Sequence, residues 1–198
     1  MQYEIEKWFR IVGYCPDEEE LKKTLSYFSD ERAEVRRQMA KLDWYCTPEE
    51  QEYAVSYLTE NLREWEYIYL VLTEEWNLAP YNPDEECYEG VSGGKWRWEN
   101  AAKVIVRLGW PKVDRIIIPL FYWLLDGCWP GSLAIESFLQ NLPEGVFEEK
   151  ANHALNHIEE YFPYGPDTRD LKKILPYQLQ IRAQKQSGDK GTNKRTIL

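Results

Sequence analysis

Apolar residues recur three or four positions apart along most of the chain, and strict apolar–polar alternation is missing. This spacing is typical of amphipathic helices and not of strands. Two helix starts have local signals, since Asp17 precedes Glu20 by three residues and Thr47 is followed by Pro48. The helix opened by Thr47 should continue, or kink, through Trp65–Leu72. Its predicted apolar positions are Tyr53, Ala54, Tyr57 and Leu58.

The segment from Ile116 to Gly131 predicts two apolar helices joined by a very short turn. We expect Asp126-Gly127 to stop the first helix, because glycine accepts the left-handed conformation found at helix ends. Pro130 should start the second helix, where its missing N–H is not needed. Pro119 should bend the first helix. Helices joined so closely lie antiparallel, as a helical hairpin.

An internal repeat favours a stack of such hairpins. When Lys41–Leu58 is aligned without gaps to Arg107–Leu124, KLDW matches RLGW, and a weaker third copy follows. Each unit has about 30 to 40 residues, the size of a two-helix solenoid repeat. We therefore predict an all-α fold of stacked antiparallel helical hairpins, a HEAT-like α–α superhelix.

Helical periodicity is lost between residues 77 and 95, where prolines, glycines and acids gather in a predicted insertion loop. The predicted organisation is a HEAT-like domain over residues 1–165 that contains this loop, followed by a C-terminal helix over 166–183. Residues 184–198 should form a disordered basic tail, because Gln184–Arg195 contains no strongly apolar residue.

Charge is distributed unevenly along the chain. Residues 171–198 hold seven Lys/Arg and one acid, whereas residues 1–170 hold 17 Lys/Arg and 33 Asp/Glu, a net charge of −16. Such a body repels a phosphate backbone, so nucleic acid is disfavoured as its partner. A basic protein would be steered toward it. The alternative is that the charge serves solubility alone.

Several aromatic residues lie among acids in and around the insertion. Acidic–aromatic surfaces can hold a basic protein partner. In the alternative interpretation the loop is solvated, and its rings fold back onto the helices. The candidate binding residues are Trp76, Tyr81, Glu85, Glu86, Tyr88, Glu89, Trp96 and Trp98.

Signals for catalysis or metal binding are weak. The sequence contains no P-loop, GxGxxG or HExxH motif. Glu149, His153 and His157 follow at i, i+4 and i+8, a spacing that can hold a metal. They lie opposite the apolar stripe of their helix, however, which favours solvated side chains. The four cysteines form no CxxC pair. We expect neither a metal nor a cofactor.

The segment WLLDGCWPG, preceded by IIIPL and WENAAKVIVRLGWP, resembles an uncharacterised bacterial family of small HEAT-like helical proteins. The likeness covers roughly Trp96 to Phe162. Cys128 departs from the family signature, which has asparagine there. The likeness implies an α-solenoid fold and no activity. The residues that match the signature are Trp123, Leu124, Asp126, Trp129 and Pro130.

Asp126 has two interpretations at this stage, a polar anchor in an aromatic pocket or a cap of the turn that follows it. The second is favoured, with Trp123 and Trp129 packing across the hairpin.

These observations favour a non-catalytic protein-binding module, in its most concrete version an immunity-type protein against a basic toxin. The alternative is a hydrolase whose carboxylates act in the solenoid groove. A nucleic-acid-binding helical-repeat protein is a third candidate, which the acidic charge disfavours. The sequence shows neither a secretory signal nor a run long enough to span a membrane, so a cytoplasmic location is expected.

Overall fold

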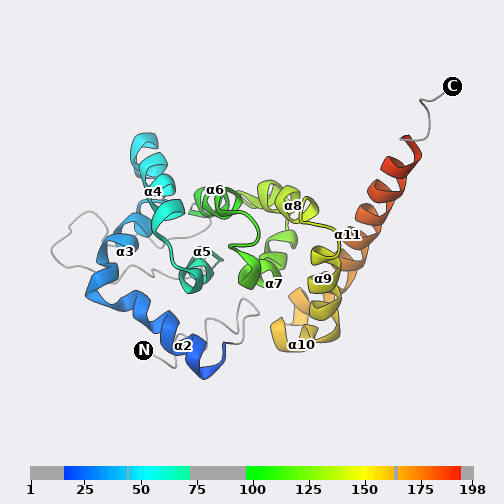
Figure 1. Cartoon of the computed structure of the whole chain (residues 1–198), viewed down its shortest axis with the longest axis horizontal. Helices are drawn as coiled ribbons and strands as arrows, with labels where there is room; N and C mark the ends of the chain where they lie inside the picture. Colours follow the sequence, from blue (N-terminus) through cyan, green and yellow to red (C-terminus); the bar gives the residue numbers. More distant parts are fainter. Residues whose placement is uncertain (1–15, 44, 72–96, 163–164, 193–198) are drawn as a thin grey trace.

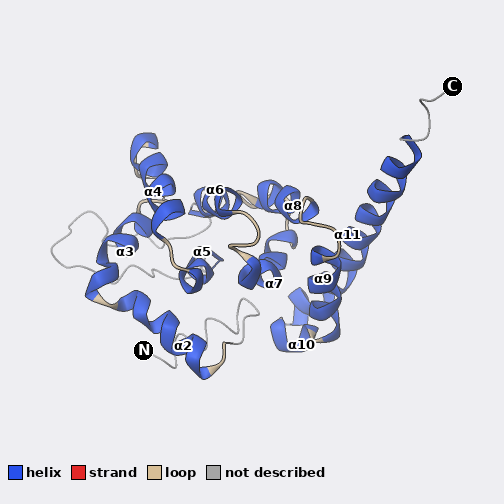
Figure 2. Cartoon of the chain, in the orientation of Figure 1, coloured by secondary structure: helices blue, strands red, loops and turns tan. Residues whose placement is uncertain are grey.

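In the computed structural model the described residues are 16–43, 45–71, 97–162 and 165–192. Every regular element within these ranges is a helix, which confirms the all-α prediction (Figure 2). The elements before residue 72 are α2 (Glu18–Leu25), η1 (Ser26–Phe28), η2 (Asp30–Arg32), α3 (Ala33–Ala40), α4 (Pro48–Asn61), η3 (Glu64–Tyr67) and α5 (Ile68–Val71). Those after residue 96 are α6 (Trp98–Leu108), η6 (Asp114–Ile116), α7 (Ile117–Leu120), η7 (Phe121–Leu124), α8 (Ser132–Gln140), α9 (Val146–Asn156), α10 (Ile158–Tyr161) and α11 (Gly165–Thr192).

The central helices alternate between two rows (Figure 1). In one row α4 packs on α6, and α6 packs on α8; the other row contains α5, α7 and α9, with α5 against α6 and α7 against α9. The repeat alignment of the sequence is therefore out of step with the structure. It pairs the segment that contains α4 with the segment that contains α7, but α4 and α7 lie in different rows.

Two helix starts form as their local signals predict. The Asp17 carboxylate accepts a hydrogen bond from the backbone N–H of Glu20 at 2.8 Å, and the Glu20 side chain accepts one from Asp17. Thr47 and Glu50 form the same reciprocal box at the start of α4. Each box satisfies two backbone donors that a helix start would otherwise leave unpaired.

The helix that Thr47 opens ends at Asn61 and does not continue through Trp65–Leu72. Leu62 has an extended backbone with ψ 137°, and the chain restarts in η3 and α5. Of the two predicted possibilities, a continuous helix is wrong. A kink is closer to the structure, although the helix ends completely.

The predicted hairpin around residues 116–131 is present in altered form. Pro119 lies in the first turn of α7, where an N–H has no intrahelical acceptor, and the helical run from Asp114 to Leu124 is divided into η6, α7 and η7. The Asp126 side chain accepts a hydrogen bond from the backbone N–H of Cys128 at 2.8 Å, which confirms its turn-capping role. Pro130 lies in the turn itself, and α8 begins at Ser132 after Gly131.

Three tryptophans hold this hairpin against α6. Trp98 stacks on Trp123 with ring centroids 5.0 Å apart and meets Trp129 edge-on at 4.8 Å. Gly131 has φ +81°, and a Cβ atom there would lie 2.7 Å from the Ala102 Cβ atom and 2.9 Å from the Trp98 carbonyl oxygen. Only glycine therefore allows α8 to begin this close to α6.

The C-terminal helix α11 is 28 residues long and passes the predicted boundary at residue 183, so residues 184–192, which were predicted to be disordered, are helical; residues 193–198 lie outside the described residues. Ala183, Gln184 and Lys185 are good helix formers, which favours continuation. Arg182 fastens the helix to the body, since it donates to the Leu139 carbonyl at 3.1 Å and to Glu148 at 2.9 Å. No helix in the described ranges has the length and apolar character needed to cross a bilayer.

Candidate protein-binding surface

The structure tests one of the eight predicted binding residues. Trp98 is 0% exposed, between Trp123 and Trp129, so it stabilises the core and offers no surface to a partner. Its assignment to a binding surface is corrected accordingly, because the period of α6 turns it inward. The other seven lie outside the described residues: Trp76, Tyr81, Glu85, Glu86, Tyr88, Glu89 and Trp96.

Both ends of the segment that contains these seven residues are fixed on the body. Val71, at the end of α5, is 2% exposed, and Arg97, just before α6, is 3% exposed. The Arg97 Nε atom donates to the Asp43 carboxylate at 2.9 Å. Because α5 packs against α6, the chain leaves and rejoins the body at neighbouring helices.

A buried hydrogen-bond network positions α4 beside the start of α6. The Asn100 side chain donates to the Leu42 carbonyl at 2.8 Å and to the Gln51 side chain at 3.0 Å. Gln51 in turn donates to the carbonyls of Asp43 and Cys46. These bonds connect the turn before α4, the first turns of α4 and the first turn of α6, so the orientation of α4 is fixed.

One side of α4 is exposed to solvent and combines acids with a tyrosine. Its buried residues are Ala54, Val55 and Leu58, whereas Tyr53 is 59% exposed. The sequence prediction that Tyr53 belongs to the apolar stripe is therefore wrong. Residues three, four and seven positions apart share one side of a helix. We call this surface the α4 face: Glu49, Glu52, Tyr53, Ser56 and Glu60.

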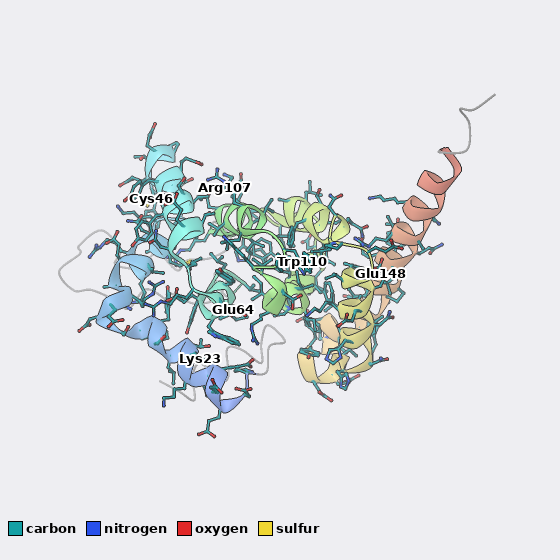
Figure 3. The ribbon with its side chains drawn as sticks, viewed as in Figure 1. Lys23, Cys46, Glu64, Arg107, Trp110 and Glu148 are labelled. Atoms are coloured by element: carbon teal, nitrogen blue, oxygen red, sulfur yellow. The ribbon has the colours of Figure 1, made fainter. Side chains whose placement is uncertain are left out.

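The α4 face keeps an excess of negative charge. Glu52 is paired with Arg107 of α6 at 2.8 Å (Figure 3). Among the described residues, Glu49 and Glu60 form no ion pair. At the edge of the face, hydrogen bonds from the backbone and side chain of Thr47 lower the pKa of Glu50. An anionic surface with an exposed aromatic ring results, and the i, i+4, i+7, i+11 spacing of these residues could have revealed it in the sequence.

A second charged cluster surrounds Trp65, but its charges compensate one another. The Arg115 guanidinium lies 3.9 Å from the Trp65 ring centroid and pairs with Glu20 at 2.7 Å and Glu64 at 2.5 Å. Lys23 lies 5.7 Å from the same ring (Figure 3). These contacts connect α2, η3 and η6, so the cluster stabilises the packing of these three elements.

Among the described residues, the two most buried carboxylates each pair with an arginine. Asp43 pairs with Arg97, and Glu66 pairs with Arg32, which also donates to the Asn61 carbonyl at 2.8 Å. Each ion pair joins residues that are far apart in the sequence, so these two acids hold elements of the fold together.

The two histidines are exposed, as the sequence predicts. The His153 Nε2 atom lies 3.0 Å from the Tyr161 hydroxyl, and the His157 Nδ1 atom lies 3.3 Å from a Glu160 oxygen. Within the described part of the chain, no three His, Cys, Asp or Glu side chains are grouped so that they could hold a metal ion.

Comparison with known proteins found no matching family model, no matching curated protein and no matching solved structure. The resemblance carried by WLLDGCWPG therefore remains a prediction, and any function has to be argued from the surface itself.

Proposed function

We propose that the chain is a non-catalytic, HEAT-like helical-repeat protein that binds a basic protein partner through the α4 face. The observation that carries the proposal is the exposure of Tyr53 between the acids Glu49 and Glu60, neither of which pairs with a described basic residue. The two alternating rows of helices support the solenoid architecture.

Long-range attraction between opposite charges and a local contact by a tyrosine ring would act together in such binding. Residues 1–170 carry a net charge of −16, which attracts a cationic partner at long range and accelerates association. Tyrosine contributes a large, rigid contact area with a polar tip, and it is enriched in protein interfaces. Because the buried network fixes α4, little of its order has to be gained on binding.

A hydrolase is the alternative function, and the described residues give it little support. Residues 90–94 read Gly-Val-Ser-Gly-Gly, which fits the GxSxG sequence of serine hydrolases. That motif acts at a sharp turn between a strand and a helix. Residues 90–94 lie outside the described residues, and the buried acids Asp43 and Glu66 each pair with an arginine.

An immunity-type protein against a basic toxin is the most specific version of the proposal, and the acidic α4 face supports it. The cytoplasm is the location we infer, because the described cysteines Cys46 and Cys128 are free thiols.

Fluorescence anisotropy with a labelled oligolysine peptide tests the proposal, with an oligoglutamate peptide of equal length as control. We expect saturable binding of oligolysine that weakens strongly between about 50 mM and about 300 mM salt, because the contact is electrostatic. Absence of oligolysine binding at the lower salt concentration, or equal binding of both peptides, would overturn the proposal.

A further inference from the structure

We propose that, without a partner, the α4 face binds the C-terminal part of α11 from a second copy of this chain. This inference rests on the proposed function, because it names one occupant of the same surface. The occupant is the helical segment from Lys172 to Thr192, which contacts the body through only part of its length.

The C-terminal part of α11 and the α4 face carry opposite charge. Residues 172–192 hold five Lys/Arg and one acid, the reverse of the balance in the body. Lys172, Lys173 and Lys185 are exposed. Lys172 and Lys173 also pair with Glu159 and Asp170, respectively, through exposed contacts that rearrange at low cost.

Both α11 and α4 expose a tyrosine beside a charged side chain. Tyr177 is 62% exposed, one turn after Lys173, and Tyr53 on α4 is 59% exposed, one turn after Glu49. Two large rings that meet between oppositely charged residues add apolar contact area to the electrostatic attraction.

The helix α11 also continues beyond the end of the body. Arg182 binds the Leu139 carbonyl, whereas Gln184 and Lys185 are exposed, and the helix extends away from the body to Thr192 (Figure 1). Helices gain most of their stability from packing rather than from intrinsic propensity. A helical end of this kind is therefore stabilised by a surface that another molecule supplies.

The geometry favours contact between copies over contact within one copy. The α4 helix and the projecting end of α11 lie at opposite ends of the molecule (Figure 1). Because α11 runs away from the body toward Thr192, its end does not reach the α4 face of the same copy, and the faces of two copies meet head to tail (Figure 1). Such contacts are not self-complementary, and they continue into chains or close into rings.

Size-exclusion chromatography with light scattering on the full chain tests the inference. At about 50 mM salt we expect a mass above 23.6 kDa that rises with concentration, and at about 500 mM salt we expect the 23.6 kDa monomer. A monomer at every concentration and both salt levels would overturn the inference.

Charge-reversal variants locate the contact. We expect Glu49→Lys with Glu60→Lys, and separately Lys173→Glu with Lys185→Glu, to give monomers, because each places like charges opposite each other. An equimolar mixture of the two variants should associate again, because the unmodified α11 of one variant meets the unmodified α4 face of the other, and the two charge-reversed faces are also complementary. Self-association that survives in both variants, or a mixture that stays monomeric, would contradict the inference.

Matched controls carry the same change of charge elsewhere on the surface. Glu18→Lys with Glu144→Lys, and Lys22→Glu with Lys112→Glu, should associate as the unmodified chain does.

The α11 variant also separates the two proposals. It should still bind oligolysine. If the unmodified chain stays monomeric while the variant binds oligolysine, the self-association inference is wrong and the proposed function stands. If neither oligolysine binding nor self-association is found, both are wrong.

Discussion

Arg97 and Asp43 form an ion pair at 2.9 Å in which the side chains are 3% and 0% exposed, respectively. This pair fixes the residue at which the chain enters α6, and Trp98 follows it directly into the core. Removing one partner of a buried ion pair leaves the other charge desolvated and uncompensated.

We expect Asp43→Asn to lower the free energy of unfolding by about 3 to 5 kcal/mol. Urea denaturation provides the measurement. The control is Glu52→Gln, which removes an exposed pair with Arg107 and should cost less than about 1 kcal/mol. Equal costs for both changes would show that the Arg97–Asp43 pair contributes no more than a surface contact.

Three glycines provide a graded series of alanine substitutions. Gly131→Ala combines a left-handed backbone with close contacts to Ala102 and Trp98, so we expect a loss of about 2 to 4 kcal/mol. Gly145→Ala has φ +86° and an open surrounding, so only the backbone cost of about 1 to 2 kcal/mol should remain. Gly127→Ala meets nothing within 4 Å and should be close to neutral. Thermal unfolding of the three variants measures the order of their losses of stability. A Gly131→Ala variant as stable as Gly127→Ala would contradict the close approach of α8 to α6.

Arg182 should control the attachment of α11. Its guanidinium donates to the carbonyls of Leu139, Gln140 and Leu142 at the end of α8, and methionine would leave them without this donor. We expect Arg182→Met to cost at least about 2 kcal/mol and to accelerate amide hydrogen exchange in α11. Lys185→Met, at an exposed position of the same helix, should leave exchange unchanged. Similar exchange in both variants would show that other contacts hold α11.

The contact between Arg182 and Glu148 predicts a pH dependence. Burial raises the pKa of Glu148, but hydrogen bonds from Arg182 and from the Gly145 backbone lower it by more, so the pKa lies below its ordinary value of 4.5. Because the folded pKa is the lower one, the stabilisation is complete above the ordinary value and is lost as the pH falls through the folded value. The stability difference between the unmodified chain and Glu148→Gln should therefore be clear near about pH 7 and shrink toward about pH 3. Urea midpoints at both pH values measure it, and a difference that is unchanged at low pH would contradict the assignment. Glu144→Gln, at an exposed position, should show no difference at either pH.

Local signals in the sequence predicted where helices start, but they did not predict how the helices pack. Asp17 and Thr47 form their capping boxes because both partners lie within four residues. The break at Leu62 and the delayed start of α8 after Gly131 depend on how neighbouring helices approach, which local patterns do not record. The packing of Ala102 against Gly131 is an example, because the two residues are distant in sequence.

The candidate surface was predicted less well than the fold class. Trp98 and Tyr53 were assigned to the wrong sides because aromatic side chains suit both cores and interfaces. The structure places Trp98 inside and Tyr53 outside. Two of the buried arginines, Arg32 and Arg97, were missed altogether, since their partners are 34 and 54 residues away in sequence.

The central claim is that the α4 face binds cationic protein, and one ratio of dissociation constants tests it most directly. The constant for oligolysine is measured by anisotropy for Glu49→Lys with Glu60→Lys and for the charge-matched control, Glu18→Lys with Glu144→Lys. Both variants change the net charge equally and place one lysine in the first turn of a helix. The account predicts that the α4 variant binds at least about tenfold more weakly than the control. Equal dissociation constants would show that binding follows net charge alone and would contradict the α4 face as the site.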